Sequence, residues 1–154
     1  MAQFAHLLIS GNFAAGVTSY EDYYPGQEHM ARIVLPIVVA GRLTIPAIVD
    51  TGAPWCILDP EVVEFLGTAI HATYTPGEKL MIRGELYEGR LLRMSLSLQA
   101  ETGDGVEIEA TVFVPILASG DTWPHPNFIG LDGFLSRIRS AIDPTENAFY
   151  FGLL

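Results

Sequence analysis

The chain has 154 residues, of which 49% are hydrophobic and 17% are charged, and its formal net charge is −10. This length suits one domain, and the apolar fraction is sufficient for a buried core, which argues against a disordered chain. The acidic balance, without any run of Lys or Arg, argues against nucleic acid as a partner at neutral pH.

Neither a membrane-spanning helix nor a signal peptide is predicted. The most apolar stretch, residues 33–49, is divided by Gly41 and Arg42, whereas a spanning helix needs about 20 continuous apolar residues. The first 16 residues carry no Lys or Arg ahead of their apolar run, unlike a signal peptide. The single cysteine, Cys56, cannot form an internal disulfide and fits a reducing compartment. We therefore expect a soluble, cytoplasmic protein with no membrane partner.

Glycine and proline punctuate short apolar runs, a pattern typical of an all-β domain with turns at regular intervals. The strands predicted in chain order are residues 3–10, 33–40, 43–50, 93–98, 106–114 and 148–154. The fourth and fifth alternate between apolar and polar residues, as strands with one buried face do. The acidic and aromatic residues 17–30 are predicted to be a surface connection.

Two short helices complete the predicted elements. Asp59 can cap the first, Pro60 suits its first turn and Gly67 suits its end. The second is predicted over residues 133–142, where apolar residues fall at helical spacing before Asp143 and a proline end the pattern.

The segment with most chemical information is residues 47–55 (AIVDTGAPW), in which Asp50 ends an apolar strand. A carboxylate at the end of a buried strand is costly unless it is hydrogen-bonded or paired. Thr51 offers a hydroxyl and Gly52 a closely approaching backbone N–H to hold it. The tripeptide alone is more typical of an ordinary turn, but the buried strand before it favours a reactive site.

A second segment, residues 126–152, places two apolar residues and a glycine before the second predicted helix and the last strand. Together with residues 47–53 and the glycine-spaced residues 81–91 (MIRGELYEGRL), it resembles the retropepsin-like aspartic proteases, the single-lobe relatives of pepsin. The resemblance is closest to the bacterial members that look like retroviral proteases. It extends over about residues 33–152, with the motifs in the same order.

This resemblance implies a closed, pepsin/retropepsin-like β barrel with one or two short helices. It implies that Asp50 is the catalytic aspartate and that Thr51 and Gly52 complete its loop. The residues that would cross behind this loop as a structural support are Phe128, Ile129 and Gly130. The chain has a single Asp-Thr-Gly triplet, so the active site would require a homodimer.

The chemistry of peptide hydrolysis leads to the same requirement. One carboxylate accepts a proton from water while another donates to the carbonyl, and two such groups in contact share a proton. A symmetric dimer places Asp50 beside its own copy. We therefore expect an aspartic endopeptidase in which the two Asp50 carboxylates activate a water, with an acidic pH optimum. One alternative is a retropepsin-fold dimer that binds extended peptides with little or no turnover; another is an unrelated small barrel with a chance motif.

The resemblance places a flap over the cleft at residues 81–91. The expected substrate-binding residues of the flap and loop are Ala53, Trp55, Ile82, Gly84 and Tyr87. The charged residues of this hairpin, Arg83 among them, are expected on its solvated face. The four histidines and one cysteine lack the spacing of a metal site, so neither a metal nor a cofactor is expected. The expected partners are a second copy of the chain and a peptide or protein substrate.

Several positions depart from the resembling family. Pro54 and Leu131 stand where retroviral enzymes commonly have an acidic residue and an arginine that help to hold the dimer. Ala53 stands where some members have a serine, which predicts a higher upper pKa for the aspartate pair.

The chain ends are also expected to matter. Residues 1–30 are predicted to be a strand and a connecting segment ahead of a protease domain at 31–154. In the resembling family, terminal strands of two chains interleave, and residues 1–10 and 147–154 are apolar enough for that role.

Overall fold

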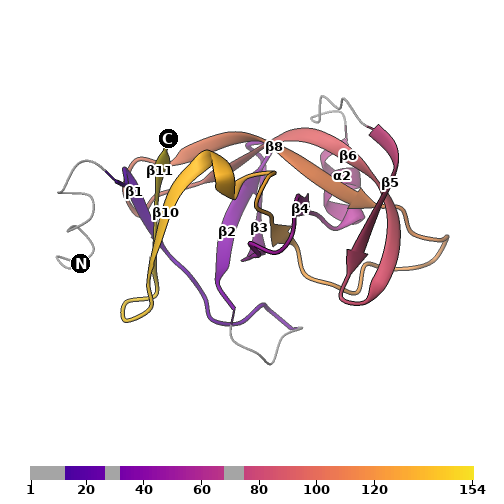
Figure 1. The fold of residues 1–154 in the computed structure, drawn as a ribbon, viewed down its shortest axis with the longest axis horizontal. Helices are drawn as coiled ribbons and strands as arrows, with labels where there is room; N and C mark the ends of the chain where they lie inside the picture. Colours follow the sequence, from indigo (N-terminus) through magenta and orange to yellow (C-terminus); the bar gives the residue numbers. More distant parts are fainter. Residues whose placement is uncertain (1–12, 27–31, 68–74) are drawn as a thin grey trace.

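The computed structural model describes residues 13–26, 32–67 and 75–154. These residues form two β-sheets, one α-helix and a short 3-10 turn (Figure 1). Within these ranges, no helix is both long and apolar enough to cross a membrane. The strand expected at residues 3–10 lies outside the described residues.

The larger sheet closes into a barrel. Its seven strands lie in the order β2-β3-β9-β4-β8-β6-β5. Their bounds are Val34–Val39 (β2), Leu43–Val49 (β3), Phe128–Ile129 (β9), Cys56–Ile57 (β4), Val106–Pro115 (β8), Glu85–Leu98 (β6) and Thr75–Ile82 (β5). A further pairing joins β2 to β6, where Val38 faces Ser97. It closes six strands into a ring and leaves β5 as an outer strand, so the predicted all-β closed barrel is confirmed.

Three antiparallel hairpins build this barrel from neighbouring segments. β2 and β3 pair along their whole length around Gly41, whose φ is 67°. β6 and β8 pair from Gly89 and Pro115 to Leu98 and Val106. β5 and β6 form the hairpin expected near residues 81–91, and it projects at the end of the molecule opposite β1 and β11 (Figure 1). The alternating apolar residues of these strands supply the buried face.

The smaller sheet has the order β10-β11-β1-β7. Its strands are Ile138–Asp143 (β10), Ala148–Leu153 (β11), Gly16–Ser19 (β1) and Thr102–Gly103 (β7). β11 is the strand predicted at the C-terminal end, and it pairs with β10 on one side and β1 on the other. Both edges of β11 are therefore occupied within the chain, so in this conformation β11 itself offers no free edge to a partner's strand. Residues 1–10, the other segment expected to interleave, lie outside the described residues.

The first predicted helix is confirmed as α2, Pro60–Leu66. The Asp59 side chain accepts a hydrogen bond from the Glu61 N–H at 2.9 Å, and Gly67 follows the last turn with a φ of 53°. Val63 and Leu66 are its buried residues, so the helix packs against the barrel through one face.

The second predicted helix is wrong. Residues 135–137 form only a 3-10 turn, and residues 138–143 are strand β10, paired with β11. The turn between these two strands is held by Asp143, whose carboxylate accepts from the Thr145 N–H and hydroxyl at 3.0 and 2.6 Å. Helical spacing over three apolar residues is a weak local preference, and pairing with a neighbouring strand overrides it.

The prediction of a surface connection over residues 17–30 is wrong at its start. Residues 17–19 belong to β1, which pairs with β11 and β7. Val17, Tyr20 and Tyr24 are buried, at 2%, 6% and 8% exposure. The acidic residues between them suggested a solvated segment. The buried aromatic side chains instead anchor this segment to the folded domain.

Buried side chains form one large cluster inside the barrel and a second, smaller cluster under the β5–β6 hairpin. The second cluster joins Ile82 of the hairpin to Ile48, Ile57 and Phe128, which belong to β3, β4 and β9. Its packing determines where the hairpin sits relative to the end of β3.

Candidate active site

Asp50 follows the last residue of β3, at the edge of the barrel. Its backbone N–H donates to the Ile129 carbonyl at 3.0 Å, and its own carbonyl accepts from the Ala53 N–H at 3.2 Å. The chain therefore turns tightly through Thr51 and Gly52. The Asp50 carboxylate Oδ1 accepts a hydrogen bond from the Gly52 N–H at 2.9 Å, which holds the carboxylate where the sequence suggested it would be held.

Strand β9 supports this turn from behind. Phe128 and Ile129 pair in parallel with Ile48 and Val49 of β3. The following Gly130 lies against the backbone of the residues after the turn, because a Cβ there would stand 2.1 Å from the Trp55 carbonyl oxygen. The chain can cross at this point only without a side chain. The three residues expected as structural support therefore lie together behind Asp50.

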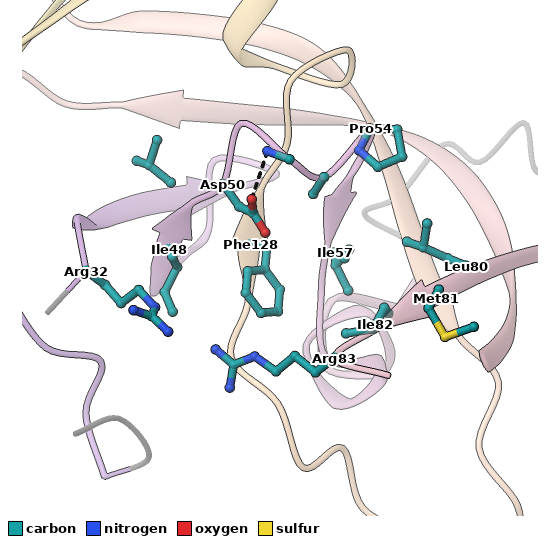
Figure 2. A pocket seen from close by; sticks show the side chains of 13 residues that line it. Arg32, Ile48, Asp50, Pro54, Ile57, Leu80, Met81, Ile82, Arg83 and Phe128 are labelled. Carbon is teal, nitrogen blue, oxygen red and sulfur yellow. Dashed lines mark hydrogen bonds between the residues drawn. The ribbon is translucent and has the colours of Figure 1, made fainter. Parts of the chain in front are cut away.

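A cavity of about 370 Å³ opens between this turn and the β5–β6 hairpin (Figure 2). Its lining residues are Arg32, Ile48, Val49, Asp50, Gly52, Ala53, Pro54, Ile57, Leu80, Met81, Ile82, Arg83 and Phe128. Asp50 contributes the one carboxylate among these described residues. The walls are otherwise apolar, apart from the two arginines.

The hairpin covers the cavity through the end of β5 and a two-residue turn. Ile82, at 4% exposure, packs against the floor. Arg83 and Gly84 form the turn with φ values of 49° and 85°, as expected for the tight turn of a two-residue hairpin. The Arg83 guanidinium lies over the Phe128 ring, 5.5 Å from its centroid.

Of the eight residues expected to be catalytic or substrate-binding, four line the cavity and four do not. Asp50, Gly52, Ala53 and Ile82 are lining residues, whereas Thr51, Trp55, Gly84 and Tyr87 are not. Thr51 is exposed at the tip of the turn. Trp55 instead stacks on Phe113, with ring centroids 6.3 Å apart.

Tyr87 anchors the hairpin to the loop that precedes β9. Its hydroxyl donates to Glu85 Oε2 at 2.5 Å and lies 3.1 Å from His125 Nε2. Its ring packs edge-on against Trp123 at 5.0 Å between centroids. The hydrogen bond to Glu85, followed by burial, raises the pKa of Tyr87 to about 12, so the hydroxyl remains a donor across the useful pH range. Burial, followed by the charge of Arg83, lowers the pKa of His125.

The sequence did not identify Arg32 and Arg83 as site residues. Arg83 is exposed, as expected for the solvated face of its hairpin, but it also lies over Phe128 and lines the cavity. A charged residue in the turn of a hairpin is ordinarily solvated, so the local sequence gave no signal that Arg83 also lines the cavity. Arg32 precedes β2 and its backbone N–H donates to the Asp22 carbonyl at 2.6 Å; nothing in its local sequence indicated the cavity.

Cys56 takes no part in the cavity. Its side chain is fully buried, and burial raises the pKa of its thiol to about 12. It is therefore a protonated, apolar core residue. In the described part of the chain, no three His, Cys, Asp or Glu side chains gather as metal ligands would.

Solved structures share this architecture. The chain is similar to a retropepsin-like aspartic protease from Rickettsia conorii, with a TM-score of 0.52 and 20% identity over 90% of this chain and 94% of that one. The retroviral protease-like domain of Ddi1 from Leishmania major gives a TM-score of 0.49 and 16% identity over 80% of this chain and 94% of that domain. No protein-family profile and no curated protein matches the sequence. The fold is retropepsin-like.

Proposed function

We propose that this chain is an aspartic endopeptidase that hydrolyses peptide bonds as a homodimer, with one Asp50 from each subunit. The observation that carries the proposal is the Asp50 carboxylate itself, held by the Gly52 N–H on the floor of a cavity that the β5–β6 hairpin covers. A purely structural turn has no need of a carboxylate that faces such a cavity. The retropepsin-like fold supports the same assignment, but fold alone does not establish activity.

The requirement for a second subunit follows from the chemistry of peptide hydrolysis. Hydrolysis without a metal or a covalent intermediate needs a base for the water and an acid for the carbonyl oxygen. The described lining residues supply one carboxylate, so the second comes from a copy of the chain. Two Asp50 carboxylates in contact would hold one proton between them. The unprotonated one would activate the water, and the protonated one would donate to the substrate carbonyl.

The catalytic turn offers a surface for this contact. Thr51 is exposed at its tip, and Leu131, which follows the supporting Gly130, is 41% exposed. The Leu131 N–H donates to the Ala53 carbonyl at 2.7 Å, so the two segments form one rigid unit. Dimerisation through this unit would bring the two Asp50 residues together. It would also hold the dimer without a free edge on β11, which is paired on both sides within the chain.

A second candidate is a peptide-binding protein of the same fold with little or no turnover. The occupied edges of β11 favour it, because they remove one means of holding two subunits together. A single subunit would keep the cavity and the hairpin but would lack the second carboxylate.

Digestion of a diverse peptide mixture from about pH 4 to pH 7 tests the proposal, because aspartate pairs titrate in and below this range. The wild-type chain is compared with Asp50→Asn, which removes the charge but keeps the shape. Asp121→Asn, at an exposed turn outside the cavity, is the matched control. We expect cleavage by the wild type and the control but none by Asp50→Asn. Equal cleavage by all three, or none by a confirmed dimer, would contradict the protease.

Mixed dimers test the requirement for two subunits. Adding excess Asp50→Asn chain to a fixed amount of wild type should reduce activity in proportion to the wild-type fraction, since a mixed dimer contains one usable carboxylate. Activity that stays constant as the inactive chain is added would show that each subunit works alone.

A further inference from the structure

We propose that the cleft selects peptides with an acidic side chain beside the scissile bond, and that Arg83 together with Arg32 binds this side chain. The inference rests on the proposed function and names the substrate class of the same site. It follows from the two guanidinium groups that line a cavity with one carboxylate.

The two arginines come from distant parts of the chain. Arg32 precedes β2 and Arg83 lies at the tip of the β5–β6 hairpin, yet both line the cavity that contains Asp50. Figure 2 shows their side chains extending into the cavity, with the Arg83 guanidinium next to the Phe128 ring. A peptide that reached Asp50 would therefore pass between two positive groups.

The positive charge of these two arginines is opposite in sign to the net charge of the chain. The chain carries 18 acidic and 8 basic residues, and two of the basic ones line this cavity. The side chains beside them, among them Ile48, Ile82 and Phe128, are apolar and offer no competing partner to a bound carboxylate. An acidic substrate side chain would be matched here, whereas a basic one would meet like charge.

The conformation of Arg83 points the same way. Its φ of 49° lies in the left-handed region, which Gly and Asn adopt more easily in a two-residue turn. A long side chain kept at this position against the local preference suggests a functional role.

Stacking on Phe128 fits the proposed role of Arg83. The Arg83 guanidinium carbon lies over the ring, 5.5 Å from its centroid, and carboxylates bind along the edge of a guanidinium, often through two parallel hydrogen bonds. The ring therefore orients Arg83 in the cleft before a substrate arrives, so less side-chain entropy is lost on binding.

Paired peptides test this inference. A short peptide cut in the Asp50-dependent digest is made with Glu or Gln at each position flanking the bond. At pH 6, we expect kcat/KM to be about tenfold higher for one Glu peptide than for its Gln counterpart, as a charge-assisted contact would give. The ratio should fall towards one in Arg83→Gln and be reduced in Arg32→Gln. Arg42→Gln, at the exposed β2–β3 turn, should keep it.

The pH dependence of the ratio between the Glu and Gln peptides supplies an internal check. The ordinary pKa of a Glu side chain is about 4.3, so the advantage of the Glu peptide should shrink as the assay approaches pH 4. The Gln peptide has no group that titrates there. The charge-reversing variant Arg83→Glu should favour a Lys peptide over both the Glu peptide and the Gln peptide.

Binding separates a failure of this inference from a failure of the proposed function. Fluorescently labelled Glu and Gln peptides are titrated against Asp50→Asn, which cannot cleave them, and anisotropy is read. If the wild type cuts nothing, the pairs are taken from a fixed library of peptides that differ by one Glu or Gln, and tighter binding of a Glu peptide that Arg83→Gln abolishes would still support the inference. Asp50-dependent cleavage with equal rates for both peptides would leave the protease standing and overturn the inference. Equal binding of both peptides, or binding of neither, would also overturn it.

Discussion

Gly130 lies directly against Trp55, so that a Cβ on Gly130 would stand 2.1 Å from the Trp55 carbonyl oxygen and 2.9 Å from the Cys56 nitrogen. Both neighbours are backbone atoms, which cannot rotate away as a side chain can. Backbone hydrogen bonds on either side, from the Asp50 N–H to the Ile129 carbonyl and from the Leu131 N–H to the Ala53 carbonyl, fix the same crossing. The segment behind the Asp50 turn thus depends on one residue without a side chain.

Gly130→Ala should therefore destabilise the fold by about 3 kcal/mol or more, because the backbone must separate where the two segments cross. Gly41→Ala is the matched control: a Cβ there meets nothing within 4 Å, and its left-handed φ alone costs about 1 kcal/mol. Urea unfolding of the two variants measures the difference. Similar free energies of unfolding would show that the contact can relax.

His125 should make stability depend on pH. Burial and Arg83 lower its pKa below the ordinary 6.5, while Glu85 acts in the opposite direction. Between the lowered value and 6.5 the unfolded chain binds the proton more readily, so stability falls as the pH drops through this window. We expect His125→Gln, which cannot titrate, to lose less stability than the wild type between about pH 7.5 and pH 5.5. Urea unfolding measures the free energy of unfolding of both proteins at each pH. An equal loss in the two proteins over this range would refute the prediction, even if one is more stable than the other by a constant amount.

Cys56 should resist alkylation in the folded protein. Its thiol is buried and its pKa is raised to about 12, and the thiolate is the reactive form. At pH 8, iodoacetamide should modify the urea-unfolded chain within minutes and leave the native chain unmodified, as followed by mass spectrometry. Rapid modification of the native chain would mean that the core opens around β4.

Ala53→Ser should move the pH optimum of cleavage downward. Ala53 is buried at 8% exposure, lines the cavity and follows the Asp50 turn. In the proposed dimer, a serine hydroxyl there would donate to the aspartate pair and lower its upper pKa. The pH profile of kcat/KM for one peptide measures the shift, with Ala53→Gly as a control that adds no hydroxyl. An unchanged optimum in Ala53→Ser would contradict this role of the hydroxyl.

Dimerisation should be tighter at mildly acidic pH than at neutral pH. Each subunit carries −10, and the repulsion between two such chains eases as carboxylates take up protons. Sedimentation at about pH 5 and pH 7, at low and at high salt, measures the effect, because salt should reduce the difference. Equal dissociation constants at the two pH values in low salt would rule out charge repulsion as the controlling factor.

Features that depend on neighbouring residues were predictable from the sequence. The β2–β3 hairpin, the alternation of β6 and β8 and the capped helix α2 each follow from turn residues or from a short-range pattern. The Asp50 turn was recognisable for the same reason, since an apolar strand leads directly into Asp-Thr-Gly. These signals require no knowledge of what lies across the fold.

The tertiary structure decided what depends on distant partners. Residues 138–143 have a helical pattern but become strand β10 because β11 pairs with them, and residues 16–19 become β1 because β11 presents its other edge. Arg32 and Arg83 meet in one cavity only because the hairpin folds back over β9. Their convergence leaves no local trace in the sequence, because it is produced by packing between segments about 50 residues apart.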